Sequence, residues 1–363
     1  MTHPTSLADV PTPALVIDQP AMERNIQRMA EFFARGPCKL RPHFKAHKTP
    51  EIARRQLAAG SCTGLTCATV GEAETAVAFC DDLLIANQVI GEEKCARVAS
   101  LAKSVSVTVA VESEVGLEQL ATAAEAAGST VGVLVEVSIG FRCGVAPGEA
   151  VVTLARRVAD TAGVELRGLM GYEGHAVGLE DRERREGAAR SALQRLTMSL
   201  EAVEYRGMPC RMVSAGGTGT YDITGRLEGI TEIQAGSYVL MDTAYAKLDL
   251  PFEKAFWVQG TVLSRPSPTL VVADCGHKSC SQDHGMPDVK EVPGATVMFL
   301  ADEHALITVP EECGLAPGDP VALWPSHIDP TINLHDVFYV LNDAEVTDVW
   351  PISARGYPEQ RRA

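Results

Sequence analysis

The sequence lacks features that mark several classes of protein. No apolar run reaches about 20 residues, and the first residues, MTHPTSLADVPTP, have neither the charged start nor the apolar stretch of a secretion signal. None of the ten cysteines belongs to a CxxC pair, so a thiolate zinc site is not expected. Basic residues are in the minority, and the net charge of -15 repels polyanions. We therefore expect a cytoplasmic protein with reduced thiols that binds neither nucleic acid nor a membrane.

Short apolar runs alternate with amphipathic stretches over the first two thirds of the chain. The stretches between the runs are rich in Ala, Leu, Glu and Arg, as helix propensity requires. Eight such strand-helix units that close on themselves make a TIM-type (β/α)8 barrel, in which chemistry lies at the C-terminal ends of the strands. The predicted strands are residues 39–45, 64–68, 83–87, 106–111, 131–138, 164–172, 211–217 and 230–236.

The character of the sequence changes near residue 250. Runs such as VQGTVLSRPSPTLVVADCG and ATVMFLADEHALITVP are β-branched and broken by Pro, Gly and Asp, with no good helix between them. We expect an α/β chain with three parts: an N-terminal segment at 1–20 that joins the β domain, a cofactor-binding barrel at 21–248, and a second, mainly β domain at 249–363.

Residues 41–50, RPHFKAHKTP, concentrate basic side chains in an acidic chain. Lys45 comes at the C-terminal end of the first predicted strand. His43, His47 and Lys48 are close enough in sequence to lower the pKa of its amine by charge repulsion and desolvation, as a Schiff-base lysine requires. A solvated basic loop is the alternative interpretation of this stretch taken alone.

Two glycine-rich segments follow the seventh and eighth predicted strands: SAGGTGTYD at 214–222 and QAGSYVLMD at 234–242. Loops at these two strand ends form the common phosphate site of TIM barrels, although either segment alone is typical of an ordinary turn. A lysine and a phosphate site at one barrel mouth indicate pyridoxal phosphate, whose aldehyde would bond to Lys45.

The segment PSHIDPTINLHD, residues 325–336, carries a possible metal pair. His327 and Asp329 are separated by one residue, so on an extended backbone both side chains project to the same face, within reach of one divalent ion. His335 and Asp336 are further candidates. A carboxylate is a harder ligand than a thiolate, which favours magnesium or manganese over zinc.

These segments together resemble the alanine-racemase-like, fold-type III pyridoxal-phosphate enzymes, and within them the D-threonine aldolase and D-serine dehydratase group. Similar stretches run from TPALVID at 12–18 to PSHIDPTINLHD, and so cover essentially the whole chain. The resemblance implies a homodimer whose β domain supplies a metal pair that faces the cofactor. It assigns Lys45 as the Schiff-base lysine, Thr218, Gly236 and Ser237 as phosphate ligands, Arg142 and Tyr172 as residues beside the cofactor ring, and His327 and Asp329 as the metal pair.

The reaction implied by the resemblance is the cleavage of a β-hydroxy-D-amino acid, such as D-threonine or 3-hydroxy-D-aspartate, to glycine and an aldehyde. A D-serine or 3-hydroxy-D-aspartate dehydratase would use nearly the same residues, and that alternative stays open. An amino-acid racemase or a non-catalytic cofactor-binding barrel fits less well, because neither needs a second domain with a His-x-Asp pair. His175 and His277 lie at predicted strand ends, where an acid-base role and a hydrogen-bonded structural role are both consistent with the sequence.

Overall fold

The computed structural model describes residues 4–140 and 142–357, which form two compact units. The barrel unit comprises residues 29–45 and 52–236, and the remaining segments, among them the chain from 237 onward, make up the β unit. The domain boundaries at 20/21 and 248/249, which come from the sequence, stay a prediction.

The sheet of the barrel unit has the architecture expected from the sequence. Its strands are β2 (Lys39–Leu40), β3 (Leu65–Cys67), β4 (Asp82–Gln88), β5 (Ser106–Val111), β6 (Val131–Glu136), β7 (Val164–Met170), β8 (Met212–Ala215) and β9 (Glu232–Ile233). They run parallel in the order β2-β9-β8-β7-β6-β5-β4-β3. Parallel bridges from Leu40 to Cys62 and from His43 to Thr66 join the two ends and close the barrel. Seven of the eight predicted apolar runs contain one of these strands, and the run at 83–87 lies within β4.

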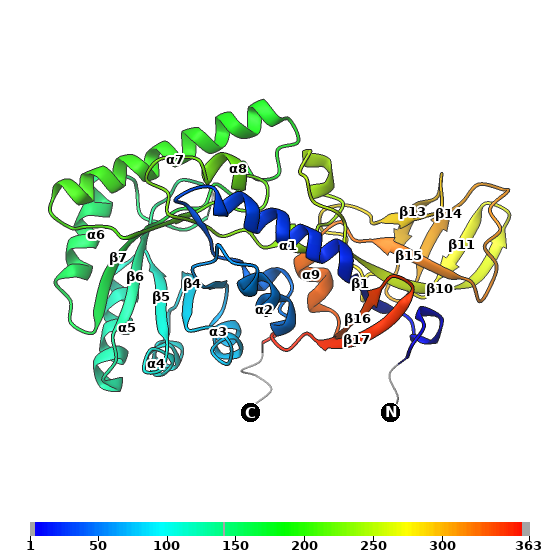
Figure 1. The fold of residues 1–363 in the computed structure, drawn as a ribbon, viewed down its shortest axis with the longest axis horizontal. Helices are drawn as coiled ribbons and strands as arrows, with labels where there is room; N and C mark the ends of the chain where they lie inside the picture. Colours follow the sequence, from blue (N-terminus) through cyan, green and yellow to red (C-terminus); the bar gives the residue numbers. More distant parts are fainter. Residues whose placement is uncertain (1–3, 141, 358–363) are drawn as a thin grey trace. The chain divides into compact units, whose positions relative to one another are not determined.

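One helix, α1, precedes the first barrel strand, and an α-helix follows each of the strands β2 to β8 (Figure 1). They are α1 (Gln19–Ala34), α2 (Pro50–Ala58), α3 (Val70–Ala76), α4 (Glu92–Leu101), α5 (Glu114–Ala127), α6 (Glu149–Ala159), α7 (Arg182–Tyr205) and α8 (Tyr221–Thr224). Side-chain oxygens of Thr69, Ser113 and Asp181 accept backbone N–H groups in the first turns of α3, α5 and α7. The charged run at 180–190 therefore begins a helix, as its acidic start predicts.

The barrel is filled by side chains from neighbouring strands. Leu84 and Ala86 of β4 are two residues apart and point to the same side, where they pack with Ala110, Leu134 and Met170 of the next three strands. All five are buried, so the interior is a packed core and chemistry is confined to the strand ends.

A buried ion pair lies where the barrel closes. Arg41 follows β2 directly and is 1% exposed. Its Nε donates to Glu232 Oε2 at 2.8 Å, and its Nη1 donates to Asp82 Oδ1 at 3.0 Å. Glu232 begins β9 and Asp82 begins β4. One guanidinium therefore ties together the first, third and last strands of the barrel in chain order.

The β unit is built on a nine-stranded sheet. Its strands are β1 (Ala14–Asp18), β10 (Phe256–Ser267), β11 (Leu270–Ala273), β12 (Asp288–Lys290), β13 (Thr296–Leu300), β14 (Ala305–Thr308), β15 (Pro320–Trp324), β16 (Val337–Asn342) and β17 (Glu345–Pro351). β1 pairs antiparallel with β10 and parallel with β16, so the N-terminal strand lies in this second sheet (Figure 1). Short 3-10 turns occur at η1 (Leu7–Asp9), η2 (Phe44–Ala46), η3 (Ser237–Val239) and η4 (Tyr245–Leu248).

One helix of the β unit was not expected. α9 (Ile328–Asn333) lies between β15 and β16, after the β-branched runs from which the mainly β domain was predicted. Pro330 falls in its first turn, where the missing N–H has no intrahelical partner to lose. Ile328 and Ile332 are fully buried and hold the helix against the unit.

No helix within residues 4–140 and 142–357 has the length and apolarity needed to cross a membrane. The cytoplasmic location stays a prediction.

Replacing Arg41 tests the importance of barrel closure. Arg41→Met is expected to lower the free energy of unfolding by about 3–5 kcal/mol, because it leaves the Glu232 carboxylate buried without its cation. The matched control is Arg190→Ala, which removes an exposed 2.8 Å ion pair with Glu186 on α7 and should cost only about 0.3–0.5 kcal/mol. Urea unfolding measures both; equal losses in the two variants would contradict the special importance of the buried pair.

Candidate functional site

The predicted cofactor residues all follow the carboxyl ends of barrel strands. Lys45 lies in η2 after β2, Arg142 comes after β6, Tyr172 after β7, and Thr218 after β8. Gly236 and Ser237 follow β9. Because the strands are parallel and the barrel is closed, these strand ends share one rim. The structure thus gives these residues a common edge, while their contacts with a cofactor stay a prediction.

The chain that leads to Lys45 is firmly held. Beyond Arg41, the backbone N–H of His43 donates to the carbonyl of Ala235 at 3.1 Å. Phe44 is fully buried, and its ring lies 6.0 Å from that of Phe79 in an edge arrangement. Lys45 itself is exposed. An exposed amine on an anchored backbone is a suitable position for a covalent cofactor link.

Arg142 is oriented by a buried carboxylate. Its Nη2 donates to Glu136 Oε1 at 2.9 Å and to the carbonyl of Ala86 at 3.4 Å. Glu136 ends β6 and is 1% exposed, and it also accepts a hydrogen bond from the Gln88 amide. The guanidinium predicted to line the cofactor ring is therefore fixed at the rim by residues of β4 and β6.

The glycine-rich loop after β8 is organised by Glu173, which is fully buried. The Glu173 carboxylate accepts the Gly216 N–H at 3.1 Å, the Thr220 hydroxyl at 2.8 Å and the Thr224 hydroxyl at 2.6 Å. The sequence analysis assigned no role to Glu173. Its three donors come from a segment more than 40 residues later, so no local spacing pointed to it.

Glycine is required at two positions of the same loop. Gly216 has a φ of +74°, which L side chains rarely adopt. A Cβ on Gly219 would collide with the carbonyl of Val177. Tyr172 lies against the loop as well, with its ring carbon Cε2 3.5 Å from the position that a Cβ on Gly217 would take. Tyr172 and the predicted phosphate loop are thus neighbours, as the cofactor prediction requires.

Changing Glu173 tests whether it shapes this loop. Glu173→Gln keeps the size of the side chain but turns an amide N–H₂ toward hydrogen-bond donors. It should lower the free energy of unfolding by about 1–3 kcal/mol and weaken binding of pyridoxal phosphate, followed by absorbance titration. Thr224→Val removes a single donor and should cost about 1 kcal/mol. If Glu173→Gln kept wild-type stability and cofactor affinity, the loop would not depend on this carboxylate.

The predicted metal pair lies at the start of α9 and not on extended backbone. His327 is the extended N-cap residue, and Asp329 is in the first helical turn, so the expected strand-like geometry was wrong. The side chains still approach each other, with 3.7 Å between His327 Nε2 and Asp329 Oδ2. This separation is too long for a hydrogen bond. It is close to the roughly 3.0–3.5 Å between two ligand atoms of one ion, given metal-ligand distances of about 2.1 Å.

The first turn of α9 is held by Asp242. Its carboxylate accepts the backbone N–H of Ile328 at 3.1 Å and that of Tyr245 at 2.8 Å. Burial of the carboxyl group raises the pKa of Asp242 to about 6, against the lowering effect of these two hydrogen bonds. His327 makes no side-chain cap of its own helix. A remote carboxylate therefore caps α9 and leaves the His327 imidazole for other contacts.

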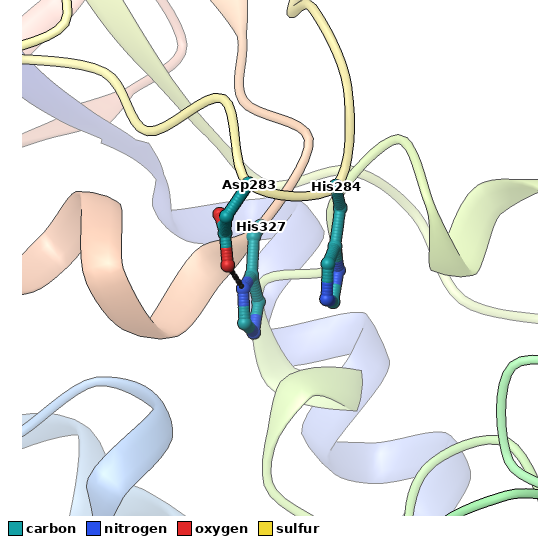
Figure 2. A group of neighbouring side chains, drawn as sticks. All are labelled: Asp283, His284 and His327. Atoms are coloured by element: carbon teal, nitrogen blue, oxygen red, sulfur yellow. Dashed lines mark hydrogen bonds and ion pairs between the residues drawn. The ribbon is translucent and has the colours of Figure 1, made fainter.

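Two further residues gather around His327. Asp283 and His284 come from the loop between β11 and β12. One potential metal-ligand atom from each of these residues and from His327 lies within 4.8 Å of the other two. Asp283 Oδ2 is 2.6 Å from His327 Nδ1, and the His284 ring stacks on the His327 ring at 3.9 Å and 7° (Figure 2). Partial burial acts to raise the pKa of Asp283, but hydrogen bonds from Ser281 and His327 hold it below its usual value.

Sequence reasoning missed Asp283 and His284. They come 44 and 43 residues before His327, so no short sequence spacing connects them to it. The one local signal was the Asp-His-Gly sequence at 283–285.

The other metal candidates have different partners. His335 Nε2 lies 2.7 Å from the carbonyl of Ser279, and its burial lowers its pKa. Asp336 pairs with Arg355. These two candidates therefore have other partners, and they are not in the cluster of Asp283, His284 and His327. His277 pairs with Asp302 at 2.9 Å on the surface.

Comparisons with known proteins show which family the chain resembles along its length. The family profile described as alanine racemase, N-terminal domain, matches residues 17–244, and that of a putative serine dehydratase domain matches 255–341. The chain is 39% identical to a D-threonine aldolase of Arthrobacter sp. over 359 residues, which cover 97% of this chain and 94% of the relative. It is 32% identical to a 3-hydroxy-D-aspartate aldolase of Paracoccus denitrificans (strain Pd 1222) over 361 residues, or 96% and 93%. The crystal structure of D-threonine aldolase from Filomicrobium marinum has a TM-score of 0.95 at 38% identity and covers 98% of both chains.

Proposed function

Because the chain belongs to the alanine-racemase-like, fold-type III family with D-threonine aldolase and D-serine dehydratase-like domains, we propose that it is a pyridoxal-phosphate- and metal-dependent aldolase. Its substrates would be β-hydroxy-D-amino acids of the D-threonine or 3-hydroxy-D-aspartate type, cleaved to glycine and an aldehyde. The observation that carries this proposal is the approach of His327 Nε2 and the Asp329 carboxylate at the start of α9.

The barrel unit would hold pyridoxal phosphate. Lys45 would bind it covalently, Thr218, Gly236 and Ser237 would contact its phosphate, and Arg142 and Tyr172 would flank its ring. The amides of Gly216 and Gly217 already bond within the loop, to Glu173 and Thr220, so these two glycines support the shape of the site. When bound, the cofactor withdraws electrons from the substrate Cα.

The β unit would hold the divalent cation through His327 and Asp329. One imidazole and one carboxylate suit manganese or magnesium better than zinc, since no thiolate is present among these ligands. When bound, such an ion lowers the pKa of a coordinated hydroxyl group. Cleavage then removes the proton of the β-hydroxyl, breaks the Cα–Cβ bond and leaves the electron pair on Cα, which takes up a proton to give glycine.

Dehydration is the second candidate, and the match of residues 255–341 to a serine dehydratase domain favours keeping it. In that reaction the α-proton and the β-hydroxyl leave, and the product decays to a keto acid and ammonia. The aldolase proposal is preferred because the two aldolase relatives are similar over nearly the whole chain. A racemase or a non-catalytic cofactor-binding protein would have no use for the pair at 327 and 329. A homodimer stays a prediction.

Product analysis tests the proposed reaction. The enzyme loaded with pyridoxal phosphate and Mn²⁺ should convert D-threonine to glycine and acetaldehyde. Chelation should abolish turnover reversibly, because the β-hydroxyl would lose the cation that lowers its pKa. Formation of keto acid and ammonia without glycine would replace the proposal by the dehydratase, and formation of L-allo-threonine, the product of inversion at Cα, would replace it by the racemase.

Borohydride reduction tests the assignment of Lys45. The purified protein should be yellow, and reduction should bleach it and fix the cofactor to the peptide that contains Lys45, as read by mass spectrometry. Lys48→Ala is the matched control and should keep the adduct, whereas Lys45→Ala should lose it. An adduct on Lys48 or on any other lysine would show that the assignment is wrong.

A further inference from the structure

We propose that Asp283 is a positioning residue of the metal centre, which holds the His327 imidazole so that Nε2 faces the cation. His284 would assist by fixing the plane of the His327 ring. This inference rests on the proposed function, since it assumes that His327 and Asp329 bind a divalent cation.

The hydrogen bond to Asp283 decides which nitrogen of His327 carries the proton. An ionised carboxylate only accepts hydrogen bonds, so the 2.6 Å contact with Asp283 Oδ2 places the proton on His327 Nδ1. In a neutral ring, Nε2 then has the lone pair. Nε2 is the nitrogen that lies 3.7 Å from Asp329 Oδ2. Asp283 thus fixes the tautomer through Nδ1, and Nε2 on the other side of the ring faces Asp329, the second predicted ligand.

This arrangement has a known physical effect on metal sites. Histidine ligands commonly donate their second ring N–H to a carboxylate, which fixes the ring and makes the ligating nitrogen more basic. His327 is largely buried, with 23% of its side chain exposed, whereas Asp283 is 49% exposed. Asp283 is therefore the more exposed member of the pair that it forms with His327, and water can still reach it.

His284 does not fit as a second ligand in this geometry. An imidazole binds a metal ion through a lone pair in the plane of its ring. The rings of His284 and His327 are parallel within 7° and 3.9 Å apart (Figure 2), so an ion in the plane of one ring lies well outside the plane of the other. The three clustered side chains therefore do not form one chelate. His284 covers a face of His327 and restricts its rotation.

The loop that carries Asp283 is itself anchored beside α9. The Ser281 N–H donates to Thr331 Oγ1 of α9 at 3.1 Å, and Ser326 Oγ donates to the carbonyl of Gly285 at 2.7 Å. Ser281 Oγ also donates to the second carboxylate oxygen of Asp283. Both ends of the loop are thus tied to the segment that carries His327, which is what a positioning carboxylate requires.

Mn²⁺ affinity provides the test, measured on the cofactor-loaded, chelator-stripped full chain by electron paramagnetic resonance of free Mn²⁺. Asp283→Ala should weaken binding about 10- to 100-fold, the usual effect of removing such an outer partner. Asp283→Asn should lose clearly less, because its amide oxygen still accepts the Nδ1 proton. Asp302→Ala removes another Asp-His contact of the same unit, that with His277, and should bind Mn²⁺ like the wild type.

Nitrogen-15 NMR of the metal-free protein adds a readout that does not depend on metal. His327, identified by the signal lost in His327→Gln, should be protonated at Nδ1 in the wild type and shift toward Nε2 protonation in Asp283→Ala. Unchanged affinity and tautomer in Asp283→Ala would overturn the inference alone. Equal and complete loss of Mn²⁺ binding in Asp283→Ala and Asp283→Asn would also overturn it, because that result would indicate that Asp283 is a direct ligand. A wild-type protein that bound no Mn²⁺ would reject the proposed metal dependence as well.

Discussion

The ion pair between Arg41 and Glu232 joins the first and last strands of the barrel, and the predicted cofactor site depends on that closure. Both strands are only two residues long, so they contribute few ladder hydrogen bonds. The guanidinium adds a buried, charge-assisted link from the residue that follows β2 to the residue that begins β9. Backbone hydrogen bonds from Lys39, Arg41 and His43 join the same two segments, so the ion pair reinforces the closure that brings Lys45 and Gly236 to one rim.

The same principle holds at the start of α9 in the β unit. His327 and Asp329 are two residues apart, yet their arrangement depends on carboxylates from distant parts of the chain. Asp242 caps the helix from 86 residues away, and Asp283 binds the imidazole from 44 residues away. Carboxylates that are not among the predicted ligands thus set the geometry of the predicted metal pair. Glu173 and Glu136 do the same in the barrel unit, for the glycine-rich loop and for Arg142.

The sequence predicted the barrel well because buried parallel strands are continuous apolar runs, which composition reveals directly. It placed Thr218 just beyond a strand, but it made the first strand too long, because β2 ends at Leu40 and Lys45 lies in the 3-10 turn η2. It failed at α9, where His327 and Asp329 were expected on an extended backbone, because the cap that stabilises the helix comes from the distant Asp242. Asp283 and Glu173 escaped notice since a hydrogen bond across 40 or more residues leaves no periodic pattern. His335 and Asp336 were proposed as ligands from proximity in sequence alone, and their side chains bond elsewhere.

Diffraction at the manganese absorption edge, from crystals grown with pyridoxal phosphate and Mn²⁺, tests most directly whether His327 and Asp329 bind the metal ion and Lys45 binds the cofactor. We expect an anomalous peak bonded to His327 Nε2 and the Asp329 carboxylate, with Asp283 on the other side of the imidazole. We also expect continuous electron density from Lys45 into the cofactor. A manganese ion bound through Asp283 or His284, or a cofactor linked to a lysine other than Lys45, would contradict it.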